Sequence, residues 1–136
     1  MKKTKTILID FLVLIAAMAG VTIVNILGTM ILEHIFGPAM NPDGIPLTQG
    51  STIAFLIMFF IAGMTAACIA AYLARSNPWI LVGILLVIAL VVDFIAITQG
   101  PPSELFLWAK IAAMVSIPPQ IWVGAKIGIR LRGSGK

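Results

Sequence analysis

Apolar residues run through most of this chain in four long stretches, and short polar segments separate them. Each stretch has about the 20 apolar residues that an α-helix needs to cross the hydrocarbon core of a bilayer, and none alternates apolar and polar positions as a half-buried strand does. The pattern predicts an all-α protein, an integral membrane four-helix bundle in which residues 1–136 form a single transmembrane domain. The expected spans are residues 7–32, 51–74, 79–98 and 105–129.

The three segments between these stretches have the composition of turns. The first contains an Asn-Pro-Asp-Gly run, and these residues favour turns over helix. The second is short and ends in Pro78, which suits the first position of a helix. The third contains Pro101-Pro102 followed by Ser103 and Glu104, whose side chains can bond the first amides of a helix. The last two spans are therefore expected to be antiparallel neighbours.

Lysine and arginine gather at the two termini and in the second connection, which four spans place on the same side of the membrane. The cytoplasmic segments of multi-pass proteins accumulate these residues. This distribution predicts that both termini are cytoplasmic. The first and third connections contain no Lys or Arg but do contain Glu33, Asp43 and Glu104. The cations of the termini and the second connection are Lys2, Lys3, Lys5, Arg75, Lys126, Arg130, Arg132 and Lys136.

The composition agrees with a membrane protein. Hydrophobic residues make up 60% of the chain and charged residues 10%, whereas soluble domains have about 25% charged residues. The net charge is +4, but the cations lie mostly at the two ends. That placement suits anionic lipid headgroups better than a nucleic-acid groove, which needs a continuous basic face. We expect membrane lipids and no nucleic acid as partners.

Small residues recur at four-residue intervals in two of the spans. Gly63, Ala67 and Ala71 lie in the second span, and Gly124 and Gly128 lie near the end of the fourth. Such spacing lets helices in lipid approach closely. It predicts contact within the bundle, with a homo-oligomer or a larger membrane complex as the alternative.

Polar residues at membrane depth are costly, and each is a candidate for function. At about 1.5 Å per residue, Asp93 and Lys110 each lie roughly 7–9 Å below the outer boundary, so we expect them to form an ion pair. The pair is interpreted as a device that fixes helix register, or alternatively as a substrate or ion site; a third alternative is that the two side chains extend separately toward water. A polar face of the first span would oppose them, and it consists of Thr22, Asn25, Thr29 and Glu33.

His34 is the only side chain whose ordinary pKa lies near neutrality. It is a candidate pH-sensitive residue, and the alternative is a solvated position at the start of the loop. One histidine does not make a zinc site, which takes three or four protein ligands. The chain contains no Gly-x-Ser-x-Gly, Cys-x-x-Cys or phosphate-binding glycine loop. We therefore expect neither an enzyme nor a cofactor.

Pro118 and Pro119 lie inside the fourth span. Two prolines remove two backbone donors, so a kink or a local break is expected between residues 113 and 117. Broken helices line binding sites in many transporters, although non-functional kinks are also common.

The order of several short motifs is similar to that of a group of small bacterial inner-membrane proteins with four spans and no assigned activity. The resemblance implies the four-span architecture and a location in the bacterial cytoplasmic (inner) membrane, and it implies no mechanism. Met30 stands where that group has an acid four residues before the histidine. The motifs are His34 with Pro38, Ile45-Pro46, the Gly63/Ala-rich stretch ending in Arg75, Pro101-Pro102 with Trp108, and Gly124 with Gly128.

Two function hypotheses follow from these features. The first is a small non-enzymatic membrane protein that acts as a subunit or binds a lipid or partner through its bundle. The alternative is an oligomeric small transporter or channel that uses an outer-half polar site around Asp93 and Lys110. A tight pair without a cavity favours the first hypothesis, and a hydrated pocket continuous with the outside favours the second.

Overall fold

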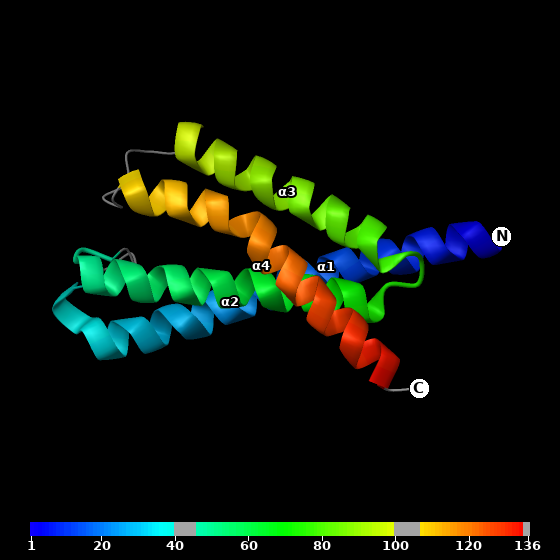
Figure 1. The fold of residues 1–136 in the computed structure, drawn as a ribbon, viewed down its shortest axis with the longest axis horizontal. Coiled ribbons are helices and arrows are strands. Elements are labelled where there is room, and N and C mark those ends of the chain that lie inside the picture. Colours follow the sequence, from blue (N-terminus) through cyan, green and yellow to red (C-terminus); the bar gives the residue numbers. More distant parts are fainter. Residues whose placement is uncertain (40–45, 100–106, 135–136) are drawn as a thin grey trace.

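The computed structural model describes residues 1–39, 46–99 and 107–134, without the side chains of Ala96, Ile97 and Gln99. Over these residues the protein is all-α, as predicted (Figure 1). The first helix runs further than the predicted span at both ends, because Lys is a good helix former and the membrane boundary does not by itself end a helix. The elements are α1 (Lys2–Phe36), the 3-10 turn η1 (Gly37–Ala39), α2 (Gln49–Leu73), α3 (Pro78–Gln99) and α4 (Leu107–Ser134).

Local signals in the sequence explain where α2 and α3 begin. The Thr48 hydroxyl accepts a hydrogen bond from the backbone N–H of Ser51, and the Thr48 N–H donates to the Ser51 hydroxyl. This reciprocal cap satisfies two amides that the first turn leaves free. Pro78 is the first residue of α3, as its position predicts, and the Asn77 side chain accepts a hydrogen bond from the Trp79 N–H at 3.0 Å.

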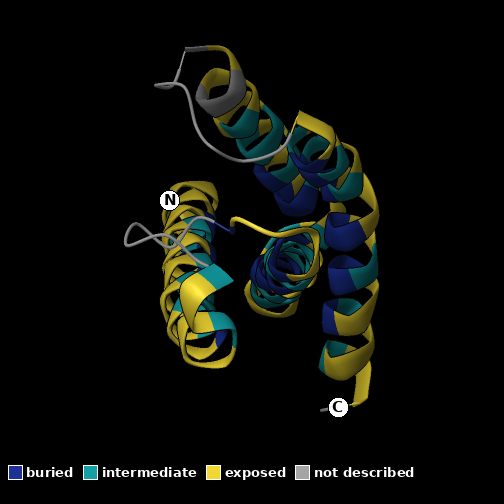
Figure 2. Cartoon of the chain, turned by 90° about the vertical axis from the view of Figure 1, so that its left-hand side faces the viewer, coloured by how far each residue is buried: buried dark blue, intermediate teal, exposed yellow. Residues whose placement is uncertain are grey.

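Helix α2 is the centre of the molecule. It packs most extensively against α4, next against α1, and also contacts α3. Figure 1 shows the two termini and the α2–α3 connection at one end of the molecule, and the α1–α2 connection at the other. In Figure 2, which views the helices nearly end-on, buried residues gather where helices face one another and exposed residues cover the outward faces.

The contact between α2 and α4 depends on small residues. A Cβ added to Gly124 would meet the carbonyl oxygen of Met64 and lie 2.9 Å from the Cβ of Ala67. A Cβ added to Gly128 would lie 2.5 Å from the carbonyl oxygen of Cys68. These separations are shorter than a side-chain carbon tolerates, so only glycine allows this approach. The predicted contact within the bundle is therefore present.

Three helical segments are long and apolar enough to cross a membrane, which indicates a membrane protein. In the part of the chain that the structure describes, α4 does not meet the same standard. Its residues include Lys110, Gln120, two prolines and a basic last turn. The three segments are Lys2–Ala39, Gln49–Leu73 and Pro78–Ile95.

Helix α4 continues through Pro118 and Pro119 without leaving the α-helical conformation. Because proline has no N–H, the carbonyl groups four residues before each of them lose their usual helical donor. One turn earlier, the Ser116 hydroxyl donates to the carbonyl oxygen of Ala113 at 2.7 Å. The chain is thus helical across the predicted break, and the kink stays a prediction.

Candidate functional site: a pocket between the four helices

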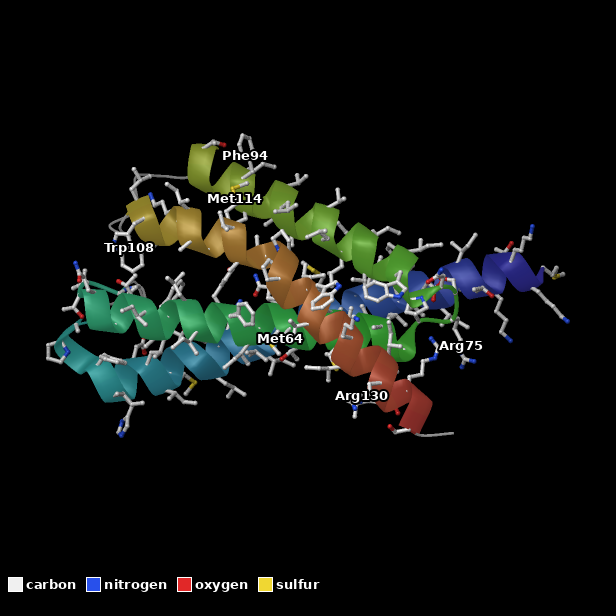
Figure 3. All side chains as sticks on the ribbon, in the orientation of Figure 1. Met64, Arg75, Phe94, Trp108, Met114 and Arg130 are labelled. Atoms are coloured by element: carbon white, nitrogen blue, oxygen red, sulfur yellow. The ribbon has the colours of Figure 1, made fainter. Side chains whose placement is uncertain are left out.

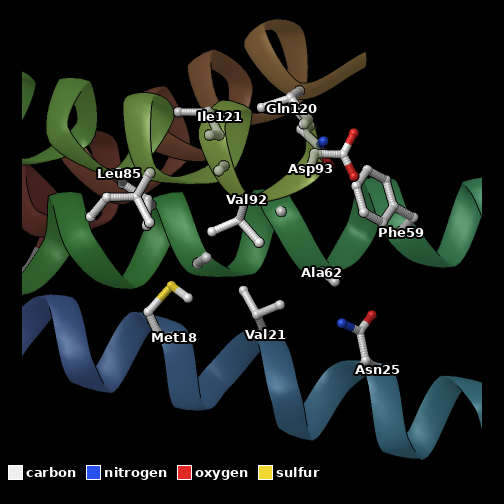
Figure 4. A pocket seen from close by; sticks show the side chains of 15 residues that line it. Met18, Val21, Asn25, Phe59, Ala62, Leu85, Val92, Asp93, Gln120 and Ile121 are labelled. Carbon is white, nitrogen blue, oxygen red and sulfur yellow. The ribbon is translucent and has the colours of Figure 1, made fainter. Parts of the chain in front are cut away.

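A partly enclosed pocket with a volume of about 240 Å³ lies where the four helices meet (Figure 4). Most of its lining is aliphatic. Three lining side chains are polar, and each comes from a different helix: Asn25 from α1, Asp93 from α3 and Gln120 from α4. The other lining residues are Met18, Val21, Phe59, Ala62, Gly63, Ala66, Leu85, Ile88, Ala89, Val92, Ile117 and Ile121.

Asp93 is the ionisable group of this pocket. Its Oδ2 atom is buried and has no hydrogen-bond partner among the described residues. Gln120 and the ring of Phe59 line the same pocket as the Asp93 side chain (Figure 4). A buried polar atom without a partner costs free energy, and a charged side chain at membrane depth costs more. Native proteins seldom retain such a group without a reason.

The predicted ion pair between Asp93 and Lys110 is not formed in the described structure. The two side chains have different surroundings. Asp93 of α3 lines the central pocket, whereas Lys110 of α4 does not.

Gln120 is a site residue that the sequence analysis missed. Only 2% of its surface is exposed. With its amide oriented to satisfy its surroundings, its nitrogen donates to the carbonyl oxygens of Phe59 at 3.0 Å and Phe60 at 3.1 Å. The amide occupies the space that a Cβ at Gly63 would need. A polar residue directly after two prolines was the available signal, but its partners lie on another helix.

Of the four residues of the predicted polar face of α1, one lines the pocket and three do not. Asn25 lines the pocket. The Thr22 hydroxyl instead bonds the Met18 carbonyl oxygen of its own helix at 3.1 Å. Thr29 is half-buried and Glu33 is exposed, and neither lines the pocket. The exposed His34 follows at the end of α1, nine residues after Asn25.

A second buried carboxylate lies near the other end of the bundle. Asp10 is 8% exposed, and its Oδ1 accepts a hydrogen bond from the backbone N–H of Arg75 at 2.8 Å. Ser76 and the guanidinium of Arg132 also act on this carboxylate. This hydrogen bond joins α1 to the α2–α3 connection, a role that was not predicted from the sequence.

The chemistry of the pocket suits binding. Its lining contains one carboxylate, two amides and one aromatic ring, but no histidine, cysteine or hydroxyl group. No group of three or more His, Cys, Asp or Glu side chains in the described residues is arranged to hold a metal ion. The arrangement can accept a cation or a hydrogen-bond donor at Asp93 and surround the rest of a ligand with apolar side chains.

Comparisons of the chain with protein-family models, with curated proteins and with solved structures gave no match. The function is therefore inferred from the pocket and from the distribution of charge.

Proposed function

We propose that this chain is a non-enzymatic bacterial inner-membrane protein with four spans whose bundle binds a small, mostly apolar molecule that carries one positive charge. The observation that carries the proposal is the buried, unpartnered Oδ2 of Asp93 on a pocket built by four helices. A cation in the pocket would offset the cost of burying the charge of this carboxylate.

The distribution of charge supports the four-span topology with both termini in the cytoplasm. The termini and the α2–α3 connection lie at one end of the molecule, and Arg75 and Arg130 lie at that end (Figure 3). Cytoplasmic segments are rich in such residues. Helix α4 is the least apolar span of the four, and its close packing on α2 shields part of its surface from lipid.

The size and surroundings of the pocket restrict the ligand. Its volume of about 240 Å³ is below the range of about 300–1,000 Å³ that is usual for drug-sized ligands. Phe59 lines the same pocket as Asp93, and an aromatic face attracts a cation. A monocation with a compact apolar body satisfies these conditions.

Binding of benzyltrimethylammonium tests the proposal, with neopentylbenzene as a neutral probe of the same shape. The purified protein in mild detergent should bind the cation more tightly than the neutral probe in a calorimetric titration. Asp93→Asn keeps the shape of the side chain and removes its charge. We expect this variant to weaken cation binding by at least about tenfold.

Glu33→Gln is the matched control, because it removes an exposed acid of α1 that does not line the pocket. It should leave the affinity for the cation unchanged. Equal affinity for the cation and the neutral probe, or an Asp93→Asn variant that binds the cation like the wild type, would refute the proposal.

Transport of such a cation by an oligomer is the second candidate. Pro118 and Pro119 favour it because they immediately precede Gln120 on the wall of the pocket, and a kink there would make the wall of the pocket movable. Protein in liposomes should then exchange labelled benzyltrimethylammonium across the bilayer, and Asp93→Asn should abolish the exchange. If the protein bound the cation without exchanging it across the bilayer, transport would be excluded and the binding function would stand.

A further inference from the structure

A second concave surface lies between the beginning of α3 and the last turns of α4, away from the central pocket. It has a volume of about 410 Å³ and is lined by Trp79 of α3 and by Lys126, Ile127, Ile129 and Arg130 of α4. Two cations, one indole and two aliphatic side chains thus meet at the end of the molecule that carries the termini.

The two cations of this surface have no acid on their own helices to neutralise them. Asp93 is the only acidic residue in the described parts of α3 and α4, and it lies on the central pocket. Lys126 and Arg130 are one turn apart, so they repel each other. The Lys126 ammonium lies 4.7 Å from the centre of the Trp122 ring, which fixes its position and leaves its N–H donors available. By contrast, Arg132 lies near the carboxylate of Asp10.

An apolar groove continues from this basic surface along α3 and α4. It has a volume of about 470 Å³, and it includes Trp79, Gly83, Leu86, Pro118 and Trp122 in its lining. Trp79 belongs to both surfaces. Leu86 follows Trp79 by seven positions, which corresponds to about 10 Å along the helix, or roughly two-thirds of one leaflet of the hydrocarbon core. No atom lies within 4 Å of a Cβ added at Gly83, so the groove is open there.

We propose that this surface binds an anionic phospholipid. The phosphate lies between Lys126 and Arg130, and one acyl chain follows the groove between α3 and α4. Trp79 lies at the junction, where an indole is favoured at a membrane interface. Basic pockets between spans on the cytoplasmic side are suited to anionic headgroups. The proposal depends on membrane insertion but not on a ligand in the central pocket.

Native mass spectrometry of the full chain in mild detergent tests it with two lipids that have identical acyl chains. Phosphatidylglycerol should remain bound, and phosphatidylcholine should bind at least about tenfold more weakly. Lys126→Gln/Arg130→Gln should weaken phosphatidylglycerol binding by about 30-fold, or about 2 kcal/mol for two cations. Millimolar inorganic phosphate should not displace the lipid, since phosphate alone cannot use the groove.

Lys3→Gln/Lys5→Gln is the matched control. It removes the same charge from exposed positions on α1 at the same end of the molecule. It should change phosphatidylglycerol binding by less than about twofold. Equal retention of the two lipids, an equal loss in the two double variants, or displacement by inorganic phosphate would overturn the proposal.

The acyl groove has a separate test at Gly83. Gly83→Leu fills open space rather than a packed contact, so the variant should fold and should bind phosphatidylglycerol at least about fivefold more weakly. Phosphatidylglycerol with brominated chains should quench the fluorescence of Trp79 and Trp122 in the wild type and quench it less in Gly83→Leu. If this variant showed undiminished lipid binding and undiminished quenching, the placement of the acyl chain in the groove would be wrong.

Discussion

Asp10, Gln120 and the half-buried Asp93 have different surroundings, and the difference separates a structural role from a candidate function. Asp10 accepts a hydrogen bond from Arg75 N–H, and Gln120 donates to two carbonyl oxygens of α2. Both therefore join one helix to another segment. Asp93 has a buried oxygen without a described partner. Its cost is not offset within the described chain, which is why the binding proposal rests on it.

At Asp10 we predict a loss of stability when the carboxylate is removed. Asp10→Ala leaves the amide of Arg75 without its partner, and hydrogen bonds to charged groups contribute about 1.5–3 kcal/mol. The free energy of unfolding, measured in mixed detergent micelles, should fall by about 2 kcal/mol. Asp10→Asn, which keeps an acceptor oxygen, should lose less. Glu33→Ala at an exposed position should change stability by less than about 0.5 kcal/mol, and a comparable loss there would contradict this account.

The role of a single residue could be predicted from the sequence only where its side-chain type alone set it apart from its neighbours in the chain. An acid such as Asp93 is conspicuous in an apolar span, so its candidacy followed from composition. Gln120 was not predicted, because its role depends on Gly63 of another helix. The Asp93–Lys110 pair was predicted from a loop length and an assumed depth, and it is not formed because Asp93 lines the central pocket and Lys110 does not.

At the scale of the elements, the sequence predicted the helices well and their packing in part. Pro78 begins α3 as expected, and the small residues of α2 and α4 face each other. Long apolar runs and turn residues are local signals, so they identify helices without tertiary information. The lengths of α1 and the continuity of α4 through its prolines were harder to predict, because neither membrane depth nor composition defines where helical hydrogen bonding stops.

Glycine substitutions in two helices should have opposite effects on stability. Gly124→Ala places a Cβ against the Met64 carbonyl oxygen and Ala67, and overpacking of this kind costs about 1–3 kcal/mol. Gly83→Ala places a Cβ in open space and should stabilise α3 by up to about 1 kcal/mol, since alanine is the better helix former. Unfolding titrations of the two variants in the same detergent decide the matter, and a shift in the same direction for both would count against the α2–α4 contact.

For the whole molecule, the arrangement of the ends makes the orientation testable. The termini and the α2–α3 connection share one end, so a membrane-impermeant thiol reagent should distinguish two classes of position in intact cells. Cysteines at Asp43 or Ser103 should react, and cysteines at Ser76 or Ser134 should not. The reverse labelling pattern would show that the protein has the opposite orientation, with the proposed lipid site in the outer leaflet.

The close contact of α2 with α4 has a consequence for motion. Glycine and alanine lose no rotamer freedom when they are buried, and their contact leaves no flexible side chains that could yield, so these two helices should move as one rigid unit. Helix α3 contacts α2 much less than α4 does, and α1 barely contacts α3. Displacement of α1 or α3 should therefore widen the central pocket more easily than separation of α2 from α4, and residues along α1 and α3, rather than the glycine contact, should set the rate of exchange.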